Sequence, residues 1–397
     1  MKKRLAYILL LILSIISFLT TNLQPTAYAN KEKEEQNIED EVDKRLNDLN
    51  LNEFEKFFNE LQNESLKTFG RSVKQMISDV IYNKQPFNMA TIYDSLLKAF
   101  FNQLVKTAPM VMTILIIAIL LGVFKGLSSG FSKAQTQKMI YIACYGAILS
   151  ILSIALGSIV VDVKNTINDM DTLMGIVFPI LITLTAALGG AGSVAVYQPM
   201  MAVLTTVILK IINIFIMPLF MASVIFGMVG NLSSNVKLEK LTAATKSIAE
   251  WSLGIIFSLF VAVLTAQGVT GAAFDSVSVK SAKFALSSYV PILGGYLSEG
   301  FDLVMASCVL IKNALGLCSI IILMFIVFVP VIKILVLMFS LRLAAAIIEP
   351  ISDEKIASLL YTTSKNLVTL IVILLGFAFM FFVMVMLIIL TCNFGVI

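Results

Sequence analysis

Long runs of apolar residues alternate with short polar connections along most of this chain. A membrane-spanning helix needs about 20 predominantly apolar residues. Stretches that approach or exceed this length lie at about 108–124, 139–161, 173–191, 199–230, 251–267, 303–329, 331–348 and 366–390. The pattern therefore predicts an all-α polytopic membrane protein. The blocks 199–230 and 303–348 are too long for one span each, so the expected count is about seven to ten transmembrane helices.

Prolines recur with one spacing in the apolar region. Pro179 and Pro218 are 39 positions apart, and Pro291 and Pro330 repeat that spacing 112 positions further along the chain. Proline in a helix interior removes a hydrogen bond, so all four are candidate helix breaks. A direct internal repeat of 112 residues is one interpretation, and coincidental spacing is the alternative. The corresponding division of the membrane domain 107–397 is 107–218, 219–330 and a partial third unit, 331–397.

Lysines follow the first apolar stretch of each unit. They are Lys125, Lys133 and Lys138 in the first unit, and Lys237, Lys240 and Lys246 in the second. Positively charged loops favour the cytoplasmic side of a membrane, so both loops are expected to face the cytoplasm. The segment 162–171 holds three aspartates and one lysine and is expected to be a loop on the opposite side.

The first 29 residues have the parts of a secretory signal peptide. A positive end, Lys2-Lys3-Arg4, precedes an apolar run, and Ala27 and Ala29 form a small-x-small cleavage site. An uncleaved first anchor is the alternative. Residues 30–106 carry mixed charge, and their apolar positions recur at helical spacing. We expect this segment to be a small helical extracytoplasmic region that packs on the membrane domain or on a partner.

Composition excludes several classes of function. The chain has 397 residues, of which 58% are hydrophobic and 14% charged, so its main solvent is a lipid bilayer. It has no histidine, which removes the commonest general base and the commonest metal ligand. No nucleotide-binding or hydrolase motif is present, and the net charge of +4 gives no reason to expect nucleic acid as a partner. We therefore expect no enzymatic activity, cofactor or metal.

Charged and polar residues inside apolar sequence are the candidates for a functional site. A charge at the centre of a membrane costs about 2.5–3.5 kcal/mol on insertion scales, so each suggests a polar path or a partner. The stretch from Ala266 to Glu299 is either a cavity-lining element or a plain outer loop. Lys333 and Arg342 are expected to snorkel from helix ends. The candidate residues for a polar path or partner contact are Lys210, Asp275, Lys280, Lys283, Lys312 and Asn313.

Several segments resemble the stage III sporulation protein AE family of endospore-forming bacteria. They are Ala266-Gln267-Gly268-Val269, Ser281-Ala282-Lys283-Phe284, Pro291-Ile292-Leu293-Gly294, Leu310-Ile311-Lys312-Asn313 and Arg342-Leu343-Ala344-Ala345-Ala346-Ile347-Ile348-Glu349-Pro350. The resemblance implies a multi-pass protein of the mother-cell membrane around the forespore. It further implies a secretion-like complex with a separate ATPase and a forespore membrane partner. That complex keeps the forespore competent for late gene expression.

The sequence thus favours a non-enzymatic membrane subunit of a sporulation channel or secretion-like complex. The alternative is an autonomous secondary transporter or permease with a substrate site between the two repeats.

Overall fold

The computed structural model describes residues 41–61, 72–82, 89–128, 134–230, 238–263 and 294–392. Several predictions therefore lie outside the described residues: the signal peptide with Ala27 and Ala29, the polar stretch with Asp275, Lys280 and Lys283, and the candidate helix break Pro291.

Short amphipathic helices form the described part of the N-terminal region. Residues 41–48 are helical, and α3 (Asn52–Glu60) and α4 (Val73–Ile81) follow. A capping box starts α4, because the Ser72 hydroxyl accepts from the Gln75 N–H while the Gln75 side chain accepts from the Ser72 N–H. The apolar faces are buried: α3 contacts α6, and α4 contacts α11.

The rest of the described chain is a bundle of long helices. Their bounds are α5 Met89–Ser128, α6 Ala134–Ala187, α7 Ala191–Ala202, α8 Leu209–Ile211, α9 Met217–Gly230, an unlabelled helix Glu239–Val263, α11 Gly294–Ile348 and α12 Glu354–Leu390. Two π-helical segments, Val203–Ile208 and Ile212–Ile216, join α7, α8 and α9 into one continuous rod. The all-α membrane fold is confirmed, since the described residues contain no strand and six helices apolar and long enough to cross a bilayer.

Among the described residues, the helices are longer than the sequence predicts. Residues 162–171, expected as an outer loop, continue α6, so the stretches 139–161 and 173–191 largely share one helix. Pro179 lies inside α6 and Pro330 inside α11, so neither breaks its helix. Pro218 is the second residue of α9, within the continuous rod. A proline removes one backbone donor, and contacts with neighbouring helices and local π-helical adjustment can accommodate that loss in an apolar bundle.

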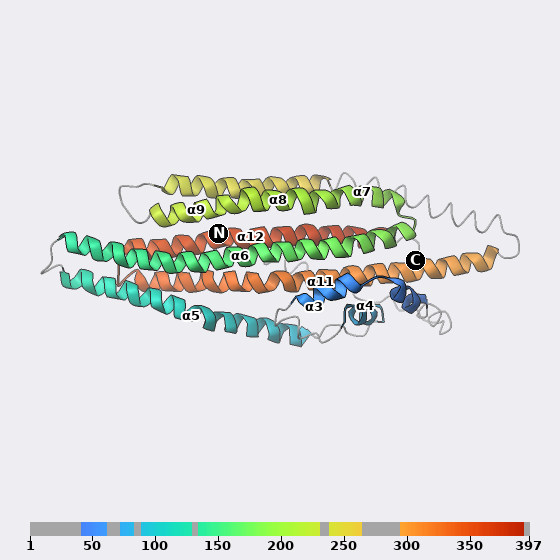
Figure 1. Ribbon diagram of the computed structural model, residues 1–397, viewed down its shortest axis with the longest axis horizontal. Helices are drawn as coiled ribbons and strands as arrows, with labels where there is room; N and C mark the ends of the chain where they lie inside the picture. The colour runs from blue at the N-terminus through green and yellow to red at the C-terminus, as the bar shows by residue number, and fades with distance from the viewer. Residues whose placement is uncertain are drawn as a thin grey trace.

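The central helix of the bundle is α11, which packs against α12, α6, α5 and α4. Figure 1 shows α11 and α12 running side by side, with α5 and α6 along them and the α7–α9 rod on an outer layer. More than half of the most apolar window of α11 and of α12 is buried inside the protein. The fraction is only about a fifth for α5 and for Glu239–Val263. A buried pair of helices is therefore surrounded by helices that expose apolar surface.

The two ends of the bundle differ. At one end lie the C-terminal ends of α5 and α9, the N-terminal ends of α6 and Glu239–Val263, and the turn from α11 to α12 (Figure 1). Lys125, Lys138 and Lys240 therefore belong to this end, which we call the basic end. At the opposite end lies the turn from α6 to α7, in which Gly189 has a φ of +81°. The N-terminal helices lie nearer this end (Figure 1). The 112-residue repeat stays a prediction.

At the basic end, α5 packs closely against the turn that precedes α12. A Cβ added at Gly122 would lie 2.3 Å from the carbonyl oxygen of Ile351, a backbone atom that cannot rotate away. The Ser352 hydroxyl donates to the Ala118 carbonyl at 2.7 Å, and Lys125 pairs with Asp353 at 3.0 Å. Only glycine at position 122 allows these two polar contacts to form.

We expect Gly122→Ala to destabilise the protein by about 1–3 kcal/mol, the usual cost of overpacking. The measurement is the thermal unfolding of the purified protein in detergent. Gly146→Ala is the matched control, because a Cβ there meets nothing within 4 Å. A melting temperature for Gly122→Ala equal to that of the control would contradict this close packing.

Candidate functional site

Lys312 is fully buried near the outer end of the bundle, opposite the basic end. Its relative exposure is 0%, and its ammonium donates to the backbone carbonyl of Thr391, the residue after the last turn of α12. Carbonyls at a helix C-terminus lack intrahelical donors and carry partial negative charge. The end of α12 therefore provides a charge-assisted hydrogen bond that offsets part of the cost of burying the ammonium.

A third helix joins this contact. The Tyr197 hydroxyl of α7 lies 2.9 Å from Oγ1 of Thr391, which also donates to the Leu387 carbonyl at 2.8 Å. We call Lys312, Thr391 and Tyr197 the lysine cluster. It connects α7, α11 and α12. Beside it, Cys392 has a φ of +60°, and a Cβ on Gly190 would lie 2.8 Å from the Cys392 sulfur.

The other charged residues of α11 also contact neighbouring helices. Lys333 pairs with Asp162 of α6 at 3.0 Å, with both side chains about one-third exposed. Arg342 donates through Nε to the Ser364 hydroxyl of α12 at 3.3 Å. Each residue thus connects α11 to another helix. Lys333 lies in the interior of α11 and Arg342 six residues before its last residue, and the expectation that these residues snorkel from helix ends stays a prediction.

The remaining candidates do not join the lysine cluster. Lys210 is exposed on α8, between the two π-helical segments. Asn313 follows Lys312, and its Oδ1 atom is buried without a hydrogen-bond partner within the part of the chain described. Of the three candidates within the described residues, therefore, only Lys312 has a hydrogen-bonding partner in this cluster.

Sequence reasoning missed the acceptors of these contacts. Asp162 was assigned to a loop, although its position after an uncharged run of 23 residues on α6 marks it as exceptional. Thr391 ends the last apolar run of the chain and was not singled out. The described residues contain no group of three or more histidine, cysteine or acidic side chains able to hold a metal. The contacts of Lys312, Lys333 and Arg342 each connect α11 to another helix.

Comparison with known proteins identifies the family. The sequence model of the family described as stage III sporulation protein AE matches residues 71–392. The chain belongs to this family. It is also 25% identical over 395 residues to the stage III sporulation protein AE of Bacillus subtilis (strain 168), and the match covers 98% of each chain. No solved structure matches.

Membership of the family confirms the resemblance seen in the sequence. The chain is thus a multi-pass membrane protein of sporulation. The family match includes every long helix of the bundle and the whole lysine cluster, whereas α3 lies before it.

We expect Lys312→Met to lower the yield of heat-resistant spores while the amount of protein in the membrane is kept. Methionine has a similar length, and its apolar side chain removes the cost of burying the ammonium, so the protein is expected to fold. Losing a hydrogen bond from a charged donor still costs about 1.5–3 kcal/mol. This cost changes the equilibrium constant for docking the end of α12 by about tenfold or more. The readouts are spore counts and immunoblots. Lys365→Met, an exposed position on α12, is the control. Normal spore counts for Lys312→Met would leave the lysine with a packing role only.

Proposed function

We propose that this chain is a non-enzymatic membrane subunit of a sporulation channel or secretion-like complex that links the mother cell and the forespore. The observation that carries the proposal is the length of its apolar helices. The apolar part of α11, Leu303–Ile348, has 46 residues. At 1.5 Å per residue it is about 69 Å long, whereas the hydrocarbon core of a bilayer is about 30 Å thick.

The uncharged stretches counted from the basic end indicate which part lies in the membrane. Three helices give such a stretch: 107–124 on α5, 139–161 on α6 and 211–230 on the α7–α9 rod, whereas Glu239–Val263, α11 and α12 carry charges within the same distance of the basic end. At 1.5 Å per residue their lengths are about 27, 35 and 30 Å. Each matches one bilayer core. Away from the basic end they stop at Lys106, Asp162 and Lys210 respectively, so these charges mark the outer boundary of the bilayer in the proposal.

The other half of the bundle then projects beyond the membrane into the space on the forespore side. Its contacts support this placement, because amphipathic α4 packs on α11 and amphipathic α3 on α6. Helices of this kind have one face for a core and one for water. They cover only part of the outer half. On α5, Phe101 is 60% exposed and Val105 is 72% exposed.

Apolar surface outside a bilayer needs a protein partner. We therefore assign the uncovered apolar faces of the outer half to contacts with other subunits of the complex. The basic end, on the cytoplasmic side, is the part that a separate ATPase could reach from the mother cell. A forespore membrane partner would be met from the opposite end. This arrangement fits a sporulation family better than an isolated carrier.

An autonomous secondary transporter remains the rival function. Such a carrier binds its substrate near the middle of the membrane, between repeats. Among the described residues, the polar contacts of α11 are separated. Lys312 and Lys333 are 21 positions apart, or about 32 Å along the helix. Both hold partners on neighbouring helices. They support helix positioning more directly than a continuous polar path.

We expect the tagged protein, purified from sporulating cells, to retain other sporulation membrane proteins. Val105→Asp should reduce this retention by about tenfold or more, because a carboxylate in an apolar contact lacks a partner. Quantitative mass spectrometry of the purified material measures the effect. Asn102→Asp is the control, since Asn102 is exposed and polar on the same part of α5.

The rival makes the opposite prediction for the purified protein. If the protein is isolated without partners and moves a solute across liposome membranes down an ion gradient, the subunit proposal is wrong and the protein is a carrier. Equal retention of partners by Val105→Asp and Asn102→Asp would remove the outer part of α5 from the proposed interface.

A further inference from the structure

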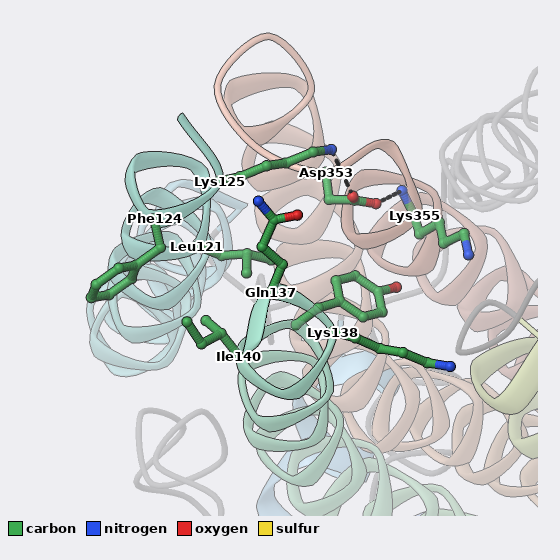
Figure 2. Close-up of a pocket in the computed structure, with 9 residues that line it drawn as sticks. Leu121, Phe124, Lys125, Gln137, Lys138, Ile140, Asp353 and Lys355 are labelled. Atoms are coloured by element: carbon green, nitrogen blue, oxygen red, sulfur yellow. Dashed lines mark hydrogen bonds and ion pairs between the residues drawn. The ribbon is translucent and has the colours of Figure 1, made fainter. Parts of the chain in front are cut away.

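A pocket of about 330 Å³ lies at the basic end, between α5, α6 and the start of α12. Figure 2 shows Lys125 extending from α5 toward Asp353. Its lining includes Phe124, Lys125, Lys138, Tyr141, Asp353 and Lys355. The pocket lining thus holds three lysines and one carboxylate, and Lys138 extends away from that carboxylate (Figure 2).

That carboxylate already has its donors. Asp353 accepts from the Lys125 ammonium at 3.0 Å and, as the N-cap of α12, from the Lys355 backbone N–H at 3.0 Å. Burial alone would raise the pKa of Asp353, but these hydrogen bonds and the two lysine charges lower it below its usual value. Asp353 is therefore ionised at neutral pH, and its charge is balanced mainly by Lys125.

Among the described residues, three other polar groups at the pocket lack such a partner: the ammonium groups of Lys138 and Lys355 and the hydroxyl of Tyr141. Within the described part of the chain, neither Lys138 nor Lys355 pairs with a carboxylate. The Lys355 ammonium lies 5.9 Å from the centroid of the Tyr141 ring, which fixes its position by a cation–π contact. The Tyr141 hydroxyl is buried and has no hydrogen-bond partner among the described residues. Of the three donors only the Tyr141 hydroxyl is buried, and a buried donor without an acceptor is costly in a folded protein. Lys138 is exposed and Lys355 is half-buried, so both ammonium groups can be reached by a ligand from solvent.

An anion with several acceptor oxygens would accept from the buried hydroxyl and balance both ammonium charges. A phosphate group fits this requirement, because its oxygens accept from ammonium and hydroxyl donors together. Large apolar side chains extend from the pocket along α5: Phe124 lines it and is 48% exposed, while Leu120 and Val123 are about half exposed. Acyl chains could pack on these side chains. Basic pockets between membrane helices on the cytoplasmic side are known to bind anionic headgroups.

We propose that this pocket binds a phosphate group, and that the phosphate belongs to the headgroup of an anionic phospholipid. Lys138, Lys355 and the Tyr141 hydroxyl are its ligands. The lipid would join α5, α6 and α12 at the cytoplasmic surface of the membrane, in addition to the direct Lys125–Asp353 pair.

The test uses the full-length protein in a neutral detergent with native mass spectrometry. The probes are phosphatidylglycerol, phosphatidylcholine and inorganic phosphate. We expect the protein to retain phosphatidylglycerol in preference to phosphatidylcholine. The double variant Lys138→Gln/Lys355→Gln and the single variant Tyr141→Phe should each weaken this binding, the double variant by about tenfold or more. Lys240→Gln is the control, because Lys240 is exposed at the same end but does not line the pocket. Thermal unfolding without lipid checks that each variant folds.

The outcomes separate the source of the phosphate from the site itself. One outcome is that inorganic phosphate raises the melting temperature of the native protein but not of the double variant, while phosphatidylglycerol is not retained. That result would keep the phosphate site and overturn the lipid as the source of the phosphate. An equal loss of lipid in Lys240→Gln would reduce the effect to general surface charge and overturn the site. Binding of neither probe would overturn it as well.

Discussion

The main physical constraint on this protein is the mismatch between the length of its apolar helices and the thickness of a bilayer. α11 is apolar over 46 residues and is the common neighbour of α4, α5, α6 and α12. A bilayer core of about 30 Å covers less than half of that length. Helix packing buries most of α11 and α12, but the helices that surround this pair expose apolar surface. A chain of this design needs lipid around one part and protein around the rest, as a subunit within a larger membrane complex would have.

Polar contacts determine how the helices sit against one another. Apolar packing between helices has little positional preference in lipid, whereas small residues and hydrogen bonds give it direction. The charged residues Lys312, Lys333 and Arg342 of α11 each contact a different place on α12 or α6. At the level of the Arg342–Ser364 contact, Lys246 donates to Oδ1 of Asn366 at 3.1 Å, which holds Glu239–Val263 against α12. Lys312, Lys333 and Arg342 lie at different levels along the bundle, so these contacts fix the register of the helices.

The sequence predicted the kind of fold well and its division poorly. Apolar runs identify membrane helices because lipid permits few alternatives. They do not reveal where two runs join through a charged segment, as at residues 162–171 of α6, because a helix can continue there once its charges find partners. Pro179 and Pro330 also did not mark helix ends, because a helix can continue through a proline when neighbouring helices accommodate the missing hydrogen bond. For the site, composition pointed to Lys312, but the acceptor at Thr391 depends on where α12 ends 79 residues later. Long-range pairing of this kind has no local signal in the sequence.

The central claim is that lipid surrounds the basic half of the bundle and protein partners surround the outer half. Two exposed positions on α6 test it: Ile154, which is 75% exposed, and Thr183, 29 residues further along the same helix. The measurement is photo-crosslinking, in sporulating cells, from an unnatural amino acid placed at each position in turn. The account predicts lipid adducts from position 154 and adducts with other proteins from position 183. Lipid adducts from both positions would contradict it.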